Sequence, residues 1–257
     1  MNVLDSVHIH YCYSLTVDLI QQIVDITKSF INKLFEIKSF QLLLQKSGDY
    51  LENIGFGSST RYDLERKLFE IIEEYCTKIK FLKLPGDNQS IHLAFDLIKN
   101  IGKNLNYLSI HFYKFGILDQ QQDGEIIKLN SIVLQELGQI LPFRLEYLNL
   151  SLMIDVDDLK IFLKNSQNIF IKKLLIRNKM NKMQSLVIGE KDILFYIEKY
   201  IMKKRMVKYF AFKEDYMKRG DLFFLKDHVK KFESYDIKVQ SYENLNINSY
   251  EYIKEMY

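Results

Sequence analysis

The stretch LEYLNL, residues 145–150, has apolar side chains at its first, fourth and sixth positions. This spacing is too dense for one stripe of a helix, and it is not the strict alternation of a strand with one face in water. The same six-residue template recurs along the chain. Clear copies start at Leu4, Leu51, Ile79, Leu105, Leu145, Ile171 and Val207, and weaker copies lie near Ile31 and Ser234. The template is therefore a repeat.

Most intervals between copies are close to the repeat length of about 20–29 residues that leucine-rich repeats have. From Leu51 onward the starts differ by 28, 26, 40, 26 and 36 residues. The two long intervals indicate insertions. We expect the first to be a loop at LDQQQDGE, residues 118–125, and the second to lie within RNKMNKMQSLVIGE, residues 177–190.

Amphipathic stretches fill the intervals and predict one helix after each strand. Leu64, Leu68, Ile71, Ile72 and Tyr75 form one apolar stripe, and similar stripes occur in residues 91–101, 156–163 and 193–201. An ordinary doubly wound α/β sheet also alternates strand and helix, but its strands would not share one template. Because no repeat can bury its apolar face alone, the copies must stack. We predict a single α/β domain over residues 1–257, a leucine-rich-repeat solenoid shaped as a horseshoe of the ribonuclease-inhibitor type. Its parallel sheet lines the concave face, and its helices cover the convex face.

The composition narrows the functional classes. The chain has 257 residues, 47% of them hydrophobic, with 36 Lys and Arg against 33 Asp and Glu. A net charge of only +3 disfavours nucleic acid or a membrane surface as the partner. Two cysteines make no disulfide framework, and no apolar run is long enough to span a bilayer. We expect a cytoplasmic or nuclear protein.

The cysteines fit the repeat and suggest a family. Residues 4–15 spell L-x-x-L-x-L-x-x-C-x-x-L, with Cys12 at the inward turn, and Cys76 directly precedes a predicted strand. With residues 44–56, 145–168 and 200–212, these patterns resemble the cysteine-containing leucine-rich repeats of a large fungal F-box/leucine-rich-repeat family. The resemblance covers nearly the whole chain. It is a resemblance to the repeat region of that family, and no F-box is part of it.

The resemblance implies the substrate-binding region of a cullin-RING ubiquitin-ligase receptor. In such receptors the repeats hold the target protein, and an N-terminal F-box docks the ligase adaptor. Because the first copy of the template opens at Leu4, we expect this chain to lack an F-box. It would then bind the adaptor only if an F-box were restored. The alternative is a stand-alone leucine-rich-repeat interaction scaffold with no link to ubiquitin transfer.

The third, fifth and seventh positions of each template are expected to face the concave side. We predict that partner-binding residues there include Phe81, Tyr107, Tyr147, Tyr209, Lys173, Arg177, Lys213 and His111. Tyrosine and arginine are favoured anchors at protein interfaces, so an exposed strip of this kind suits a target protein. The alternative is that neighbouring rings pack on one another within the sheet. The basic members favour an acidic target, unless they are simply a solvated face.

Catalytic and metal signals are weak. His8, His10 and Cys12 alternate along one strand and can share a face, but no fourth ligand is visible, and the template already turns Cys12 inward. No phosphate-binding loop, nucleophile elbow or zinc-protease motif occurs. We therefore predict no enzyme activity, no metal and no cofactor.

Overall fold

The computed structural model describes residues 6–9, 33–56, 62–85, 91–112, 120–179, 193–202, 207–215 and 220–247. Its strands are β1 (Ser6–Ile9), β2 (Asn53–Phe56), β3 (Phe81–Pro85), β4 (Tyr107–His111), β5 (Arg144–Leu152), β6 (Phe170–Asn178), β7 (Tyr209–Glu214) and β8 (Lys238–Val239). Its helices are α2 (Lys33–Ser47), α3 (Tyr62–Tyr75), α4 (Ile91–Ile101), α5 (Gln120–Ile140), α6 (Val156–Asn165), α8 (Ile193–Ile201), α9 (Lys226–Glu233) and α10 (Tyr242–Leu245). None of these helices is long and apolar enough to cross a membrane.

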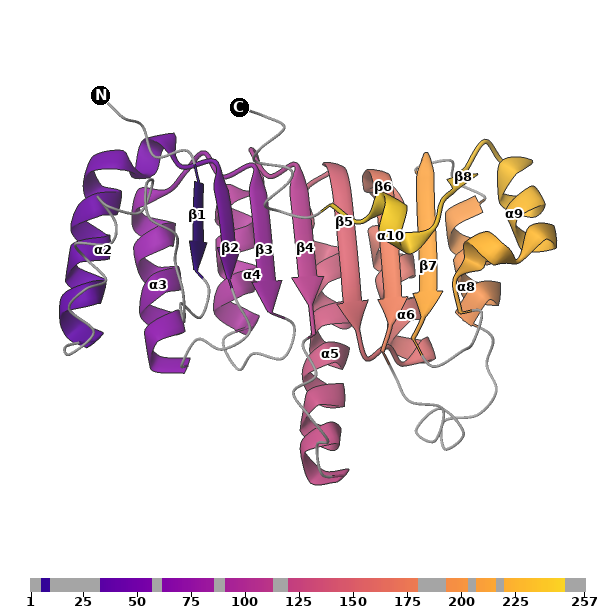
Figure 1. Cartoon of the computed structure of the whole chain (residues 1–257), viewed down its shortest axis with the longest axis horizontal. Coiled ribbons are helices and arrows are strands. Elements are labelled where there is room, and N and C mark those ends of the chain that lie inside the picture. The colour runs from indigo at the N-terminus through magenta and orange to yellow at the C-terminus, as the bar shows by residue number, and fades with distance from the viewer. Residues whose placement is uncertain are drawn as a thin grey trace.

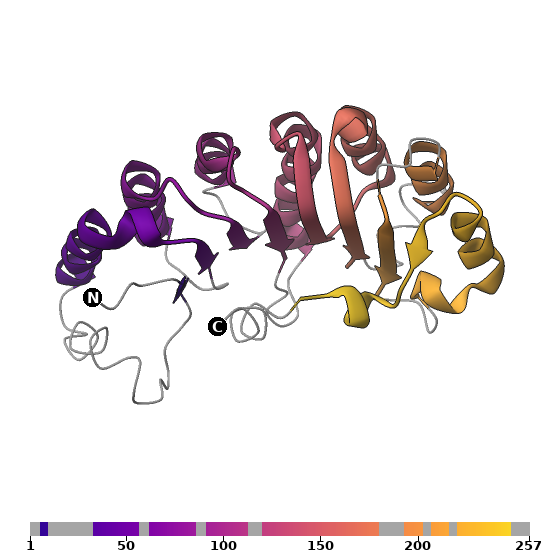
Figure 2. The same cartoon turned by 90° about the horizontal axis from the view of Figure 1, so that it is seen from above.

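The strands form one sheet in which spatial order follows chain order from β1 to β8. Every neighbouring pair is parallel, as the repeat predicts. The helices that connect strands cover one face of the sheet, and the row of elements curves with those helices on the outer side (Figure 1, Figure 2). This is an α/β arrangement that is compatible with a solenoid. We call the sheet face opposite these helices the concave face.

The strand register confirms the alignment of the clear template copies. The third positions of successive copies are paired across the sheet in the order Ser6, Asn53, Phe81, Tyr107, Tyr147, Lys173 and Tyr209. A shift of one residue in any strand would turn its apolar residues to the other face. The six-residue template therefore predicts both the pairing and the facing of these strands.

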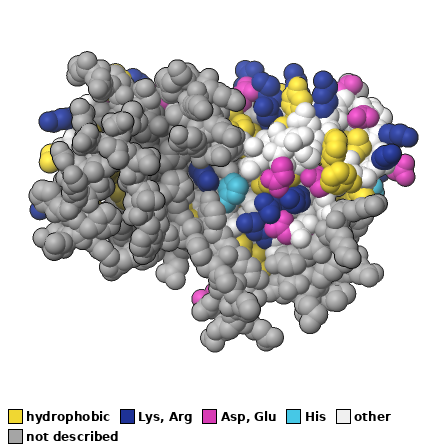
Figure 3. All heavy atoms as spheres, in the orientation of Figure 1, with side chains coloured by type: hydrophobic (Ala, Val, Ile, Leu, Met, Phe, Trp, Pro, Cys, Tyr) yellow, Lys and Arg dark blue, Asp and Glu magenta, His cyan; other side chains and the backbone are white. Residues whose placement is uncertain are grey.

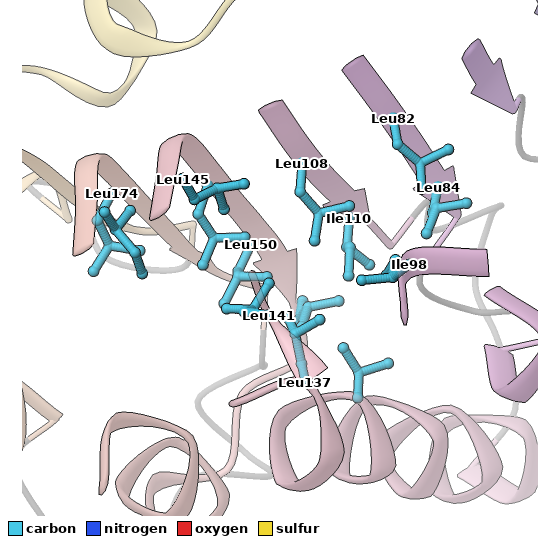
Figure 4. Packing of buried hydrophobic residues seen from close by; sticks show 14 of the residues in the cluster. Leu82, Leu84, Ile98, Leu108, Ile110, Leu137, Leu141, Leu145, Leu150 and Leu174 are labelled. Atoms are coloured by element: carbon cyan, nitrogen blue, oxygen red, sulfur yellow. The ribbon is translucent and has the colours of Figure 1, made fainter. Parts of the chain in front are cut away.

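The core lies between the sheet and the outer helices. Leu145, Leu148 and Leu150, the first, fourth and sixth template residues of β5, are fully buried. Side chains at equivalent positions of β3, β4 and β6 lie beside them, and Ile98 of α4 and Leu137 of α5 close the layer from the helix side (Figure 4). Burying one such side chain contributes about 1.5–3 kcal/mol to folding.

The long interval before β5 holds a helix, so the expected loop at residues 118–125 is wrong from Gln120 onward. Helix α5 begins at Gln120 and runs for 21 residues. Glutamine and glutamate are good helix formers, and no proline interrupts the stretch, so the additional residues lengthen the helix. The expected insertion at residues 177–190 begins within β6, and residues 180–192 lie outside the described ranges.

Both weak template copies need correction. Residues from Lys33 form helix α2 instead of a strand, because Ile37, Phe40 and Leu44 make one helical stripe that packs on the core. At the other end, Tyr209 pairs with Lys238, two residues later than the template near Ser234 predicts. The turn that ends at Asp236, whose φ is 63°, accounts for this offset of two residues in the pairing.

Candidate functional site

All eight predicted partner-binding residues lie on the concave face, in two rows that cross the strands. The third-position row contains Phe81, Tyr107, Tyr147, Lys173 and Tyr209. The seventh-position row contains His111, Arg177 and Lys213, with Ser151 between the first two. The parallel register thus aligns in one row residues that are far apart in the sequence. Phe81 and Tyr209, at the two ends of the third-position row, are 128 positions apart.

The aromatic residues of the first row pack against one another. The ring centroids of Phe81 and Tyr107 are 6.4 Å apart, and those of Tyr107 and Tyr147 are 6.0 Å apart. Phe81 and Tyr147 are buried, whereas Tyr107 and Tyr209 are partly exposed. The expectation that Phe81 is exposed for a partner is therefore wrong, because its side chain is only 2% exposed. Ring packing within the sheet therefore accounts for much of this row, and only its half-exposed members can also contact a partner.

A segment of the same chain lies on the concave face. We call residues Ser241–Ile247 the crossing segment. It follows β8, includes α10, and passes over the sheet near β6 and β7 (Figure 1). Its Tyr242 and Leu245 form a second buried cluster with three concave-face residues, Tyr147, Leu175 and Ala211. Part of the predicted binding strip is therefore covered from within the protein.

Side-chain hydrogen bonds fix the crossing segment. Tyr242 Oη donates to Asn149 Oδ1 at 2.9 Å, and Asn149 Nδ2 donates to Asn246 Oδ1 at 2.9 Å. The backbone N–H of Ile247 donates to Tyr147 Oη at 3.2 Å. Burial raises the pKa of Tyr147 and, to about 12, that of Tyr242, so both phenols are neutral at pH 7.

The expectation that Tyr147 is exposed for a partner is wrong. Its side chain is 1% exposed because the crossing segment packs over it. The sequence gives no local signal for this contact. SYENLNI, residues 241–247, follows the last weak template copy and shows no period that points to the sheet.

Acidic residues of the same chain neutralise two of the predicted basic residues. Arg177 Nε lies 2.7 Å from Asp215 Oδ1, and Lys213 Nζ lies 2.7 Å from Glu243 Oε1 in the crossing segment. The Arg177 guanidinium also lies 5.4 Å from the centre of the Tyr242 ring. Of the predicted basic group, Lys173 forms no ion pair with a carboxylate within the described ranges, whereas its neighbour Lys172 pairs with Glu146.

The charges of three basic side chains act on His111. Its Nε2 is 2.7 Å from Ser109 Oγ and 3.4 Å from Asn149 Nδ2. Burial, followed by the charges of Lys83, Lys179 and Arg177 in that order, lowers the pKa of His111 to about 3. The imidazole is therefore neutral at pH 7. Figure 3 shows basic, acidic and histidine side chains gathered near the middle of this face.

Lys83 is a basic residue that the sequence-based site omits. It occupies the fifth position of its template on β3, is half-buried, and has a pKa that burial lowers from the usual range. No carboxylate pairs with it among the residues whose placement is described. The sequence places Lys83 at a fifth position, but it does not reveal the partial burial or the lack of a carboxylate partner among the described residues.

The described residues hold no group of three His, Cys, Asp or Glu side chains that is suited to a metal ion. His8 lies on β1, whereas His10 and Cys12 lie outside the described ranges. Cys76 is buried at the end of α3, where burial and then the charge of Asp49 raise the thiol pKa to about 12. A thiol in this environment is a poor nucleophile and metal ligand at pH 7.

No family model, curated protein or solved structure matches this chain.

Proposed function

We propose that this chain is a protein-recognition module, a leucine-rich-repeat horseshoe whose concave face binds a target protein. One observation carries the proposal: the concave face already holds a polypeptide, the crossing segment Ser241–Ile247, through side chains of β5. Aligned side chains of consecutive parallel strands provide this surface, and solenoids use such extended surfaces for binding.

The chemistry of the covered part suits polypeptide recognition. The Asn149 amide gives one hydrogen bond to Asn246 and receives one from Tyr242, while Tyr147 receives one from a backbone N–H. Tyrosine, asparagine and arginine side chains of this kind are typical of protein interfaces. Beside the crossing segment, Lys173 and Tyr209 are half-exposed on the same face and can contact a second polypeptide.

The sequence resemblance supports a more specific version of this proposal. In it, the module is the substrate-binding region of an F-box-type ubiquitin-ligase receptor, and the bound target becomes the substrate of ubiquitin transfer. The alternative is an interaction scaffold that acts without a ligase. Binding of purified ligase adaptor, with and without a fused F-box, separates the two. Adaptor recruitment through the fusion, followed by modification of the bound target, supports the receptor.

A matched pair of charge reversals tests target binding. Lys173→Glu changes the concave face on β6, whereas Lys164→Glu makes the same change on an exposed position of α6, on the other side of the sheet. Proteins retained by the immobilised native chain are identified, purified and titrated against both variants. We expect Lys173→Glu to weaken binding at least about tenfold and Lys164→Glu to leave it unchanged, since about 1.4 kcal/mol corresponds to tenfold. Equal affinities for both variants and the native chain would contradict a concave binding face.

A further inference from the structure

We propose that Lys83, with Ser109 and His111 beside it, forms an anion site that binds a carboxylate side chain of an extended acidic segment in the target protein. This inference rests on the proposed function, and it names the chemistry of the partner.

The register places small residues on both sides of Lys83. It lies between Gly55 of β2 and Ser109 of β4 on the concave face. Directly opposed side chains in a sheet are close enough for contact, but glycine and serine are too small to cover the lysine side chain. Ser109 connects this position to the seventh-position row, because its Oγ is 2.7 Å from His111 Nε2.

Among the described residues, nothing compensates the charge of Lys83. Arg177 and Lys213 each pair with an acidic residue of the same chain, whereas Lys83 has no such partner within the described part of the chain. Partial burial of an ammonium group without a counter-ion costs free energy. An ion pair with a carboxylate of the partner, itself hydrogen-bonded, offsets that cost. This uncompensated charge selects an anion.

The charges around Lys83 favour an anion over a cation as the ligand. The positive charges of Lys83, Lys179 and Arg177 all lower the pKa of His111, and such a field disfavours a cationic ligand. The Ser109 hydroxyl, which is hydrogen-bonded to His111 Nε2, adds a polar group beside the lysine on the same face of the sheet. With a net charge of only +3 over the whole chain, this local field suits one acidic side chain better than a nucleic-acid backbone.

Peptide titrations test the site and require no identified target protein. The probe is a short fluorescein-labelled peptide in which Glu alternates with Val, and the comparison peptide carries Gln in place of each Glu. Fluorescence anisotropy measures binding of both peptides to the full chain. We expect the Glu peptide to bind at least about tenfold more tightly than the Gln peptide, and higher salt to reduce the difference.

Three variants make the test specific. Lys83→Met keeps the aliphatic stem and is expected to abolish the preference for the Glu peptide, Lys83→Arg to keep it, and Lys164→Met on α6 to leave it unchanged. Thermal unfolding confirms that each variant is folded. If Lys83→Met retains the preference, the anion site is wrong, while target binding that depends on Lys173 would leave the proposed function standing.

A fourth variant tests whether the chain itself supplies the carboxylate. A chain that ends at Ile247 lacks Glu251 and Glu255. We expect it to bind the Glu peptide as the full chain does. A gain in affinity that requires Lys83 would overturn the assignment to a target protein, because it would show that these residues compete for the site.

Discussion

Tyr242 Oη donates a hydrogen bond to Asn149 Oδ1 at 2.9 Å across 93 positions of the sequence. Both residues are fully buried. The backbone N–H of Tyr242 is also occupied, because it donates to Asp221 Oδ2 at 2.9 Å. This pairing attaches the crossing segment, which lies outside the clear template copies, to the middle of the sheet.

The Tyr242→Phe variant tests this attachment. The phenyl ring keeps the packing but leaves Asn149 Oδ1 without its donor, and a buried unsatisfied acceptor costs about 1–3 kcal/mol. We expect that loss in the free energy of unfolding from a urea titration. The control is Tyr235→Phe, since Tyr235 is 38% exposed and should tolerate the change within about 0.5 kcal/mol. Equal effects of the two variants would contradict the contact.

Tyr147 and Leu148 are neighbours on opposite faces of β5, yet both are buried. Leu148→Ala should cost about 2–5 kcal/mol by leaving a cavity in the core between sheet and helices. Tyr147→Ala should cost a similar amount, about 3–5 kcal/mol, as is typical of a buried aromatic residue. The reason is that the crossing segment buries Tyr147 on the other face of the sheet. A small loss at Tyr147, comparable to that of an exposed residue, would show that the crossing segment does not stay on the sheet in solution.

The sequence is sufficient to predict the order and direction of the strands. Each clear template copy puts the same three positions into a shared core. A register error would expose all the apolar residues of a strand, so only one pairing of the strands keeps them buried. Where the template weakens, the prediction fails. Residues from Lys33 onward are a helix because the stripe of Ile37, Phe40 and Leu44, at i, i+3 and i+7, outweighs a partial template match.

The candidate site is predicted less completely. The template correctly places Phe81, Tyr107 and Lys173 on one face, because facing depends only on residue parity along a strand. It cannot reveal that Tyr147 is covered or that Arg177 and Lys213 are neutralised. Those facts depend on where distant segments of the chain return to the sheet, and such long-range contacts leave no repeating pattern.

Two glycines of α5 differ in what surrounds them. A Cβ added at Gly138 would lie 2.9 Å from both Asn165 Cβ and Phe162 O of the adjacent α6, whereas nothing lies within 4 Å at Gly124. We expect Gly138→Ala to destabilise the chain, because α5 and α6 must separate. Gly124→Ala should stabilise it by up to about 1 kcal/mol through helix propensity. Thermal unfolding of both variants measures the contrast, and stabilisation by Gly138→Ala would mean that the helices are not this close.

His111 should make stability depend on pH. Its pKa is lowered from 6.5 to about 3 in the folded chain, so the unfolded chain binds a proton first as the pH falls. The free energy of unfolding then decreases from about pH 6.5 toward pH 3, by up to roughly 1.4 kcal/mol for each pH unit from this group. His111→Gln removes this contribution, so urea titrations of the two proteins should diverge most at low pH. Parallel pH profiles would contradict a buried neutral imidazole.

Lys83 and His111 should be electrically coupled, and the proposed anion site depends on that proximity. Lys83 is the first of the three cations that lower the pKa of His111 after burial itself. Lys83→Met removes this charge and retains the aliphatic stem, so the pKa of His111 should rise toward its ordinary value. NMR titration of the imidazole resonances measures the shift, and the His111→Gln spectrum assigns one signal among the five histidines. Lys164→Met, which removes the same charge from the outer face of α6, should leave that signal unchanged. If both variants titrate as the native chain does, the Lys83 charge does not act on His111, and the two residues do not form one anion site.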